Sequence, residues 1–159
     1  MNTDKLEKII NESFEKKEKV NPNSDKKIIK AISETIDLVD QGKIRVANKI
    51  DGNWVVNQWI KKAILLSFRV NEMKASKGPY STWYDKIEGK TQGWDEEKIK
   101  KAGFRYVPNG VIRKGAFIAK NVVLMPSFIN VGAYVDEGSM IDTWASVGSC
   151  AQVGKNCHI

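Results

Sequence analysis

Three side chains that could do chemistry lie close together in the sequence: Cys150, Cys157 and His158. Thiolates and imidazoles are ligands that zinc prefers, and a structural zinc site takes four of them. These residues are one ligand short, and His158 is the only histidine of the chain. Cys150 also lacks a basic neighbour in the sequence that would favour its reactive thiolate form. We therefore expect no metal site, no nucleophilic cysteine and no disulfide framework.

The charge of the chain is positive but evenly spread. The 159 residues include 26 Lys and Arg against 19 Asp and Glu, a formal net charge of +7. Most lysines alternate with acidic residues, as on the exposed face of a helix, and no segment forms a basic arm. The first residues lack the apolar run of a secretory signal, and no window approaches the roughly 18 apolar residues of a membrane span. These features predict a cytoplasmic protein that binds neither nucleic acid nor a membrane.

The first part of the chain, residues 1–109, has the pattern of a mainly helical domain. Apolar residues recur at helical spacing over residues 6–14 and again over residues 28–39. Ser24 is the expected N-cap of the second helix, and Gly42 is placed where a helix commonly ends. Two surface helices with one apolar face each are therefore predicted.

A β-hairpin is expected near residues 44–56, because Asp51-Gly52 tolerates the positive φ of a tight turn between two short apolar segments. The elements expected after it are a helix over residues 59–70, a long loop over 71–94 and a short helix over 95–102 that ends at Gly103.

From Val111 onward the apolar residues recur every six positions. The series is Val111, Phe117, Val123, Ile129, Val135, Ile141, Val147, Val153 and Ile159. Four residues after each of the first eight comes a small or compact residue: Gly115, Asn121, Ser127, Ala133, Ser139, Ala145, Ala151 and Cys157. A repeat of this period is typical of a parallel β-helix.

In such a fold three six-residue units close one triangular coil, so residues eighteen apart stack. The predicted fold class is an α+β helical domain (1–109) followed by a parallel β-helix (110–159), and the spacing does not determine its handedness. The predicted columns are Val111 under Ile129 and Val147, Phe117 under Val135 and Val153, and Val123 under Ile141 and Ile159. The small residues are expected at the tight corners. Asp142 follows the core position Ile141, so its side chain should point outward.

The predicted β-helix is short. At about 4.8 Å per coil, residues 111–159 build only about 13 Å of prism, and the core position Ile159 has no polar cap after it. We therefore expect the start of a β-helix, truncated or completed by another chain.

Two motifs in this part of the chain are specific: Phe-Arg-x-Val-Pro at residues 104–108 and Met-x-Asp-Thr-Trp-Ala at residues 140–145. With these motifs the chain resembles the 2,3,4,5-tetrahydropyridine-2,6-dicarboxylate N-succinyltransferases, a family of hexapeptide-repeat acyltransferases. Further segments that carry the resemblance are 50–52, 65–69, 113–119, 123–127, 130–138 and 147–152.

The resemblance implies a left-handed β-helix and a homotrimer with active sites between neighbouring prisms. It also implies transfer of a succinyl group from succinyl-CoA to the amine of tetrahydrodipicolinate, in its opened 2-amino-6-oxopimelate form, on the route to diaminopimelate and lysine. Succinyl-CoA is then a co-substrate, and no tightly bound cofactor is expected. Since family members extend beyond residue 159, most of the CoA site is expected outside this chain, and we predict no turnover by the chain alone.

The resemblance also implies roles for three residues. Arg105 and Asp142 match the acceptor-binding positions of the family. An arginine grips a carboxylate through two parallel N–H bonds, and Asp142 is expected to pair with the substrate ammonium and to act as the catalytic residue. Arg69 is a candidate for the second carboxylate, with a salt bridge as the equal alternative. His158 is interpreted as structural, because the resembled family does not depend on a histidine in this block.

Two alternatives remain open on the sequence. The first is another CoA-dependent hexapeptide acyltransferase with an acetyl donor, and the second is a non-catalytic trimeric scaffold. A β-helix carbonic anhydrase is disfavoured, because its metal takes three histidines and this chain has one.

Overall fold

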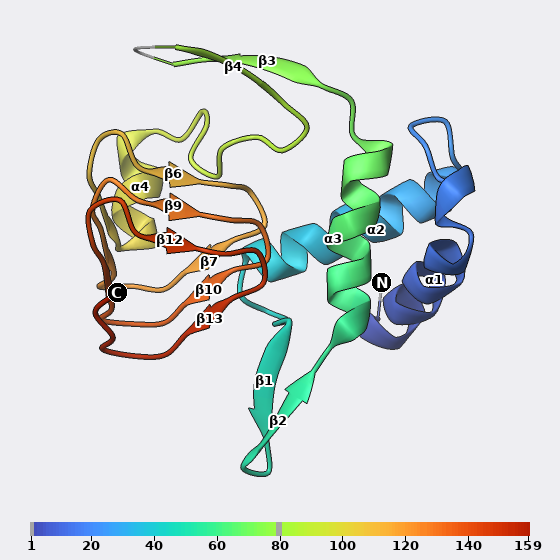
Figure 1. Ribbon diagram of the computed structural model, residues 1–159, viewed down its shortest axis with the longest axis horizontal. Helices are drawn as coiled ribbons and strands as arrows, with labels where there is room; N and C mark the ends of the chain where they lie inside the picture. The colour runs from blue at the N-terminus through green and yellow to red at the C-terminus, as the bar shows by residue number, and fades with distance from the viewer. Residues whose placement is uncertain (1, 79–80) are drawn as a thin grey trace.

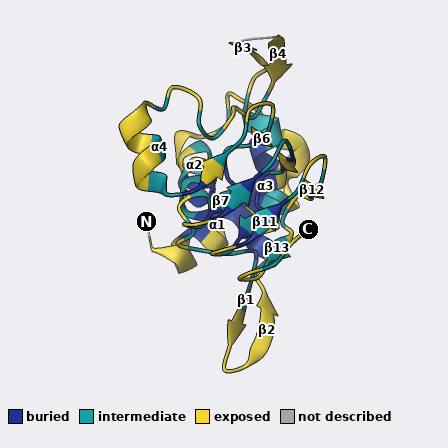
Figure 2. Cartoon of the chain, turned by 90° about the vertical axis from the view of Figure 1, so that its left-hand side faces the viewer, coloured by how far each residue is buried: buried dark blue, intermediate teal, exposed yellow. Residues whose placement is uncertain are grey.

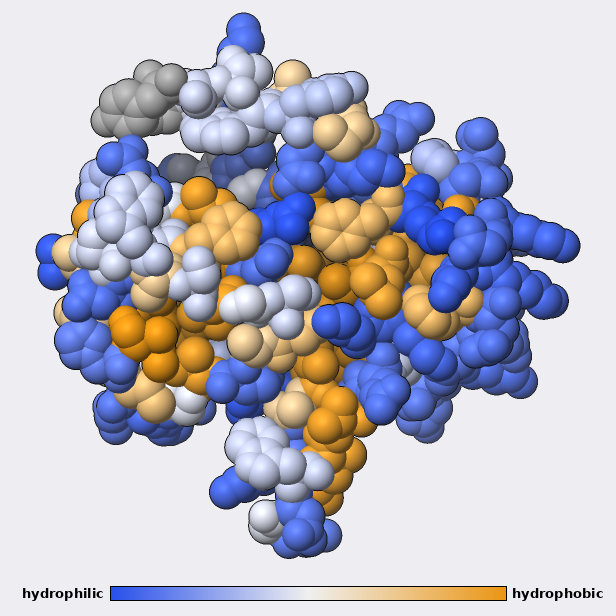
Figure 3. Space-filling view, viewed as in Figure 1, coloured by the Kyte–Doolittle hydropathy of each residue, from blue (hydrophilic) through white to orange (hydrophobic). Residues whose placement is uncertain are grey.

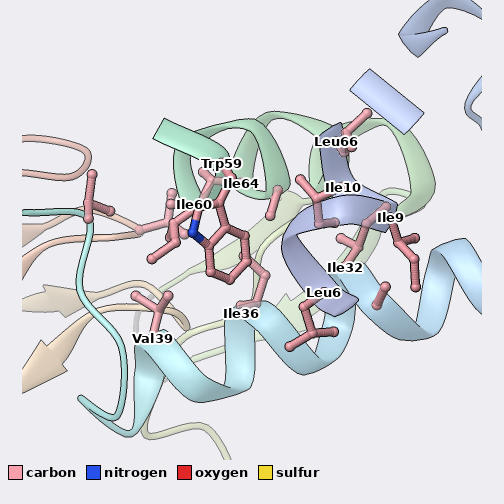
Figure 4. Packing of buried hydrophobic residues seen from close by; sticks show 14 of the residues in the cluster. Leu6, Ile9, Ile10, Ile32, Ile36, Val39, Trp59, Ile60, Ile64 and Leu66 are labelled. Carbon is pink, nitrogen blue, oxygen red and sulfur yellow. The ribbon is translucent and has the colours of Figure 1, made fainter. Parts of the chain in front are cut away.

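Three helices at the start of the chain form a compact layer, seen on the right of Figure 1. A computed structural model describes residues 2–78 and 81–159. The helices are α1 (Thr3–Glu15), α2 (Lys26–Asp40) and α3 (Gln58–Val70), with a 3₁₀ helix η1 (Lys17–Lys19) after α1. Each of the three packs against the other two. Their predicted apolar stripes meet in one core, whose labelled members in Figure 4 are Leu6, Ile9, Ile10, Ile32, Ile36, Val39, Trp59, Ile60, Ile64 and Leu66.

The caps of these helices follow local signals, with one correction. The predicted N-cap Ser24 is wrong: the side chain of Asp25 accepts the backbone N–H of Lys27 at 2.7 Å. Ser24 Oγ instead accepts the backbone N–H of Asn21, within the turn before α2. The chain leaves α2 through Gly42 at a φ of 69°, as expected of a glycine at that position.

Two antiparallel hairpins extend from the body of the molecule (Figure 1). The first, β1 (Ala47–Ile50) with β2 (Asn53–Val56), confirms the predicted hairpin and turns at Asp51-Gly52, both at positive φ. The second, β3 (Lys74–Lys77) with β4 (Thr82–Asp85), lies where a long loop was predicted. That prediction is wrong, because both strands are largely exposed and polar residues dominate β3, so no alternating apolar pattern marks them. Figure 2 shows both hairpins as mainly exposed.

The short helix α4 (Glu96–Ala102) leads into the second part of the chain. Asp95 caps its N-terminus by accepting the backbone N–H of Lys98 at 2.8 Å. Gly103 ends it at a φ of 76°, as predicted. Phe104, which is buried, then anchors the chain in the second core.

The second part is a stack of very short parallel strands with three faces. The sheets have the strand orders β11-β8-β5, β12-β9-β6 and β13-β10-β7, and every pairing in them is parallel. The predicted parallel β-helix architecture is therefore confirmed. Its strands are β5 (Arg105–Tyr106), β6 (Val111–Ile112), β7 (Phe117–Ile118), β8 (Val123–Leu124), β9 (Phe128–Ile129), β10 (Tyr134–Val135), β11 (Met140–Ile141), β12 (Ser146–Val147) and β13 (Gln152–Val153).

The first three predicted core positions are wrong by one residue. Val111 is 40% exposed, and Phe117 and Val123 are only partly buried. Their strand partners confirm the shift, because Val111 pairs with Phe128 rather than with the predicted Ile129. The residues that face the core there are the next ones along the chain: Ile112, Ile118 and Leu124.

The cause of the shift is one short corner. Leu124 and Ile129 both face the core but lie five residues apart, because the corner at 125–127 has one residue fewer than the other corners. After this corner the predicted period of six gives four buried positions correctly: Ile129, Val135, Ile141 and Val147. The last two predicted core positions are not buried in this structure, since Val153 is only partly buried and Ile159 is 51% exposed. Each early strand carries two adjacent apolar residues, so composition alone did not show which one faces inward.

The predicted small residues divide in the same way. Gly115 and Asn121 are corner residues at positive φ, and the buried small positions beside them are Ala116 and Val122, both fully buried. Three later small residues are buried as predicted: Ser127, Ala133 and Ser139. The last three are not, since Ala145 and Cys157 are only partly buried and Ala151 is exposed.

The two parts have separate cores that meet at Val131, a β-helix residue that packs into the helical core. An ion pair lies beside this junction, where Nζ of Lys90, in the segment before α4, is 2.8 Å from Asp40 Oδ2 at the end of α2. Asp40 Oδ1 in turn accepts the backbone N–H of Gly115 at 2.8 Å. The domain boundary near residue 109 stays a prediction, and β5, before that residue, already pairs with β8 of the β-helix.

Candidate functional site

One outer face of the β-helix carries the two residues that the resemblance selects. Its sheet has the strand order β11-β8-β5. Arg105 pairs with Val123, and Val123 pairs with Met140, so these three residues form one column on the outer surface. His158 continues the column through a parallel bridge to Met140.

Asp142 lies on the same face, one residue beyond the inward Ile141, as its position in the repeat predicted. The ladder fixes its backbone, because its N–H donates to the carbonyl of Ile159 at 2.9 Å. Its carboxylate is half-exposed and is held at both oxygens. Oδ2 lies 2.9 Å from His158 Nε2, and Oδ1 accepts the backbone N–H of Thr143 at 2.7 Å.

These two contacts make Asp142 a stable anion. The hydrogen bond from His158, followed by that from the Thr143 backbone, holds the pKa of Asp142 below its ordinary value of 3.8. The carboxylate is therefore ionised at neutral pH. An ionised carboxylate with a lowered pKa is a weak base but a good partner for an ammonium group.

Arg105 presents a cation at the other edge of this face. Its backbone N–H donates to the carbonyl of Val122, which ties β5 to the coil above. Its side chain is exposed, and no ion pair of its guanidinium occurs within residues 2–78 and 81–159. Strands of one sheet lie about 4.8 Å apart, so β5 and β11 are separated by about 10 Å across β8. An extended arginine and a short ligand can span that distance toward Asp142.

The corner after Asp142 carries an unusual tryptophan. Trp144 is 79% exposed and has a φ of 61°, a left-handed conformation that a bulky residue adopts only at a cost. Its backbone N–H donates to the carbonyl of Pro126 at 2.7 Å, which holds the corner in place. An exposed aromatic ring on a strained corner beside a fixed carboxylate is the kind of surface that contacts a ligand or another chain.

The structure does not bring Arg69 to this face. Arg69 lies at the end of α3, and its Nη2 lies 3.0 Å from both carboxylate oxygens of Glu18 in η1. The Glu18 side chain is largely exposed, and that of Arg69 is 37% exposed. The salt bridge that the sequence left as an equal alternative is therefore present, and a substrate role for Arg69 stays a prediction.

The contact between His158 and Asp142 was missed at the level of sequence. His158 was interpreted as structural, although it lies eighteen residues after Met140 and hence one coil above it. Residues at such a separation share one face, so the repeat contained the signal. The eighteen-residue coil relates outward residues as well as core residues.

The remaining candidate features add no second site. Within the described part of the chain, no group of three or more His, Cys, Asp or Glu side chains is placed to hold a metal ion. No helix among the described residues is long and apolar enough to cross a membrane. Both cysteines are free thiols.

The fold and this face define a class: a helical region that precedes a parallel β-helix of six-residue repeats, with a cation and a fixed carboxylate on one outer sheet. Comparison with known proteins shows which proteins the chain is similar to. Residues 5–70 match the family described as "Tetrahydrodipicolinate N-succinyltransferase N-terminal".

Curated relatives match nearly the whole chain. The 2,3,4,5-tetrahydropyridine-2,6-dicarboxylate N-succinyltransferase of Pelagibacter ubique is 61% identical over 97% of this chain and 57% of its own length. The proteins of the same name from Nitrobacter winogradskyi and Dechloromonas aromatica are 51% and 50% identical over 100% and 99% of this chain, and 58% of their own length. The predicted resemblance to this family is therefore confirmed, and the chain spans somewhat under three fifths of the length of these relatives.

Proposed function

We propose that this chain supplies the acceptor-binding face of an N-succinyltransferase. The reaction would move a succinyl group from succinyl-CoA to the amine of tetrahydrodipicolinate in its opened 2-amino-6-oxopimelate form, a step of diaminopimelate and lysine biosynthesis. The observation that carries the proposal is the placement of Arg105 and Asp142 on one outer sheet. The similarity to proteins with this name supports it over 97% of the chain.

Arg105 and Asp142 divide the recognition of an amino dicarboxylate between them. The planar guanidinium of Arg105 is suited to a carboxylate, and its donors are free to form two parallel hydrogen bonds. The anionic Asp142 is suited to the ammonium group, which it would hold beside the thioester carbonyl. The second carboxylate needs another cation, and Arg69 is our candidate, since its pair with the exposed Glu18 is open to solvent on one side and contributes little stability.

The chemistry needs the acceptor nitrogen as a free amine. The ammonium loses one proton to solvent, and the nitrogen lone pair attacks the thioester carbonyl carbon. The nitrogen then releases a second proton as the carbon–sulfur bond breaks. The CoA thiolate leaves and takes up a proton, so the products are the N-succinyl amine and CoA. Asp142 serves this step by orienting the nitrogen, because effective orientation lowers the barrier of a bimolecular reaction.

The wider assembly follows from the same proposal. We infer a left-handed β-helix and a homotrimer in the cytoplasm, with the acceptor bound between neighbouring prisms, succinyl-CoA as co-substrate and no tightly bound cofactor. The exposed Trp144 beside Asp142 supports a subunit seam at this corner. The left-handed winding rests on the family resemblance.

A binding experiment tests the proposal with a matched control. The ligand is 2-aminopimelate, a stable mimic of the acceptor, titrated into the chain by calorimetry. We expect saturable binding that Arg105→Ala and Asp142→Asn each weaken by at least about tenfold, since each removes a charged hydrogen-bond partner.

Asp136→Asn is the control, because Asp136 follows the inward Val135 of β10 as Asp142 follows Ile141 of β11. Its Oδ1 also accepts the next backbone N–H, from Glu137, at 2.8 Å, but it lies on another face. This variant should bind as the unsubstituted chain does. Equal binding by all four proteins, or no binding by any, contradicts the proposal.

A further inference from the structure

The only histidine of the chain contacts the carboxylate to which the proposed function assigns the amine. His158 Nε2 lies 2.9 Å from Asp142 Oδ2, a charge-assisted hydrogen-bond distance. The backbone on either side of the ring is fixed by the ladder, since the N–H of Ile159 donates to the carbonyl of Met140 at 3.0 Å and the N–H of Met140 donates to that of Cys157 at 2.8 Å. The contact is therefore a consequence of the coil stacking.

The protonation of this pair follows from Asp142. An ionised carboxylate accepts hydrogen bonds and donates none, so Nε2 of His158 must carry the proton that lies between the two groups. The two oxygens of Asp142 are then both anchored, Oδ2 by His158 and Oδ1 by the backbone of Thr143. A carboxylate offers about four lone-pair directions, so two remain for a ligand.

The residues around His158 and Asp142 offer neither of them a stronger charged partner. The strand below, β8, places Val123 and Met125 on the same outer face, on either side of the inward Leu124. The cation of that face is Arg105, two strands away. At the preceding corner, Lys155 Nζ lies 3.6 Å from Glu137 Oε2, so those two charges are paired with each other.

We propose that His158 is a positioning residue for the acceptor amine: its Nε2–H holds the Asp142 carboxylate in one orientation. This inference rests on the proposed function, because it assumes that Asp142 meets the amine. The aligned carboxylate keeps its free lone pairs toward the ligand, and without the imidazole the side chain is anchored at Oδ1 alone.

The test compares two ligands that differ only in the amine. Pimelate has both carboxylates of 2-aminopimelate but no ammonium group, so Asp142 has nothing to bind in it. We expect His158→Ala to weaken 2-aminopimelate binding by roughly three- to tenfold and to leave pimelate binding unchanged. His158→Gln, whose amide can still donate to Asp142, should restore binding of the amine ligand to within about twofold.

A second measurement keeps the test independent of ligand binding. Carboxyl-carbon NMR of Asp142 should show its pKa rising in His158→Ala, because the hydrogen bond that lowers it most is then absent. An unchanged pKa of Asp142 in this variant, or equal weakening of both ligands, overturns the inference.

The two failures are distinguishable. Suppose that the unsubstituted chain prefers 2-aminopimelate to pimelate, that Asp142→Asn abolishes this preference and that His158→Ala keeps it. The proposed function then stands, and the positioning role of His158 is wrong. If the unsubstituted chain shows no preference for the amine, the proposed function and this inference both fail.

Discussion

The helical region and the β-helix bury the same kinds of residue under different rules. In the helices the period of 3.6 specifies which residue is inside, and the predicted stripes reach the core of Figure 4. In the β-helix each strand has two residues, and the length of the preceding corner decides which of them faces inward. A repeat therefore fixes the architecture, while one short corner shifts the phase of the units before it relative to the units after it.

The helices and the hairpin β1–β2 differ in how far their apolar residues are covered. Apolar residues of the helical region are mostly covered, but the hairpin β1–β2 exposes Ile50, Trp54, Val55 and Val56. In Figure 3 apolar surface continues onto this hairpin from the body of the molecule. An isolated two-stranded hairpin is marginally stable in water, so its position depends on the elements at its base. The hydrogen bond from Asn57 Nδ2 to the carbonyl of Arg45, at 2.7 Å, closes that base.

The largest expected effect tests the phase of the β-helix. Leu124 is fully buried and Val123, beside it on β8, is only partly buried. Leu124→Ala should lower the free energy of unfolding by about 2–5 kcal/mol, because it leaves a cavity in a close-packed core. Val123→Ala should cost less than about 1 kcal/mol, since it leaves no enclosed cavity. Chemical denaturation measures both losses of unfolding free energy. A larger loss for Val123→Ala than for Leu124→Ala would contradict the shift and would place Val123 in the core.

The next effect tests the junction between the two regions. Burial lowers the pKa of Lys90, and the nearby Asp40 opposes that shift. Lys90→Met should lower the free energy of unfolding by about 2–4 kcal/mol, because the Asp40 carboxylate, only 20% exposed, loses its cation.

Lys100→Met is the control for this prediction. It breaks the exposed pair with Glu96 on α4 and should change stability by less than about 0.5 kcal/mol. Equal small effects of the two substitutions in thermal unfolding would show that the junction does not depend on the buried pair.

The smallest of these effects concerns Arg45, which contacts residues of the sheet β13-β10-β7. The guanidinium of Arg45 lies 3.6 Å from the centroid of the Tyr134 ring, and its Nε donates to Gln152 Oε1 at 3.1 Å. Arg45→Ala should cost about 1–2 kcal/mol in unfolding free energy, because it removes a cation–π contact and a hydrogen bond. Arg45→Lys should recover part of this cost, and an alanine variant as stable as the unsubstituted chain would contradict the contact.

Much of the fold could be predicted from the sequence, because helices, the Asp51-Gly52 turn and the six-residue repeat are local signals. The hairpin β3–β4 could not, since its exposed strands have no buried face to produce a pattern. The sequence also did not predict which residue of each strand before residue 125 faces the core. Strands there carry two adjacent apolar residues, such as Val111 and Ile112. Only the pairing across coils distinguishes them.

The candidate site divides in the same way. The repeat was sufficient to place Asp142 on an outer face, because the core position Ile141 before it was predicted correctly. Arg105 was selected by resemblance alone, since it precedes the first repeat that the sequence shows. The contact between Asp142 and His158 depends on the stacking of successive coils, which brings residues 16 apart to hydrogen-bond distance.

A crystal structure of the chain with 2-aminopimelate tests the central claim most directly. The account predicts one carboxylate of the ligand against the guanidinium of Arg105 and its ammonium against the Asp142 carboxylate, on the outer sheet β11-β8-β5. Ligand bound elsewhere on the chain, with Arg105 and Asp142 facing solvent, would contradict it.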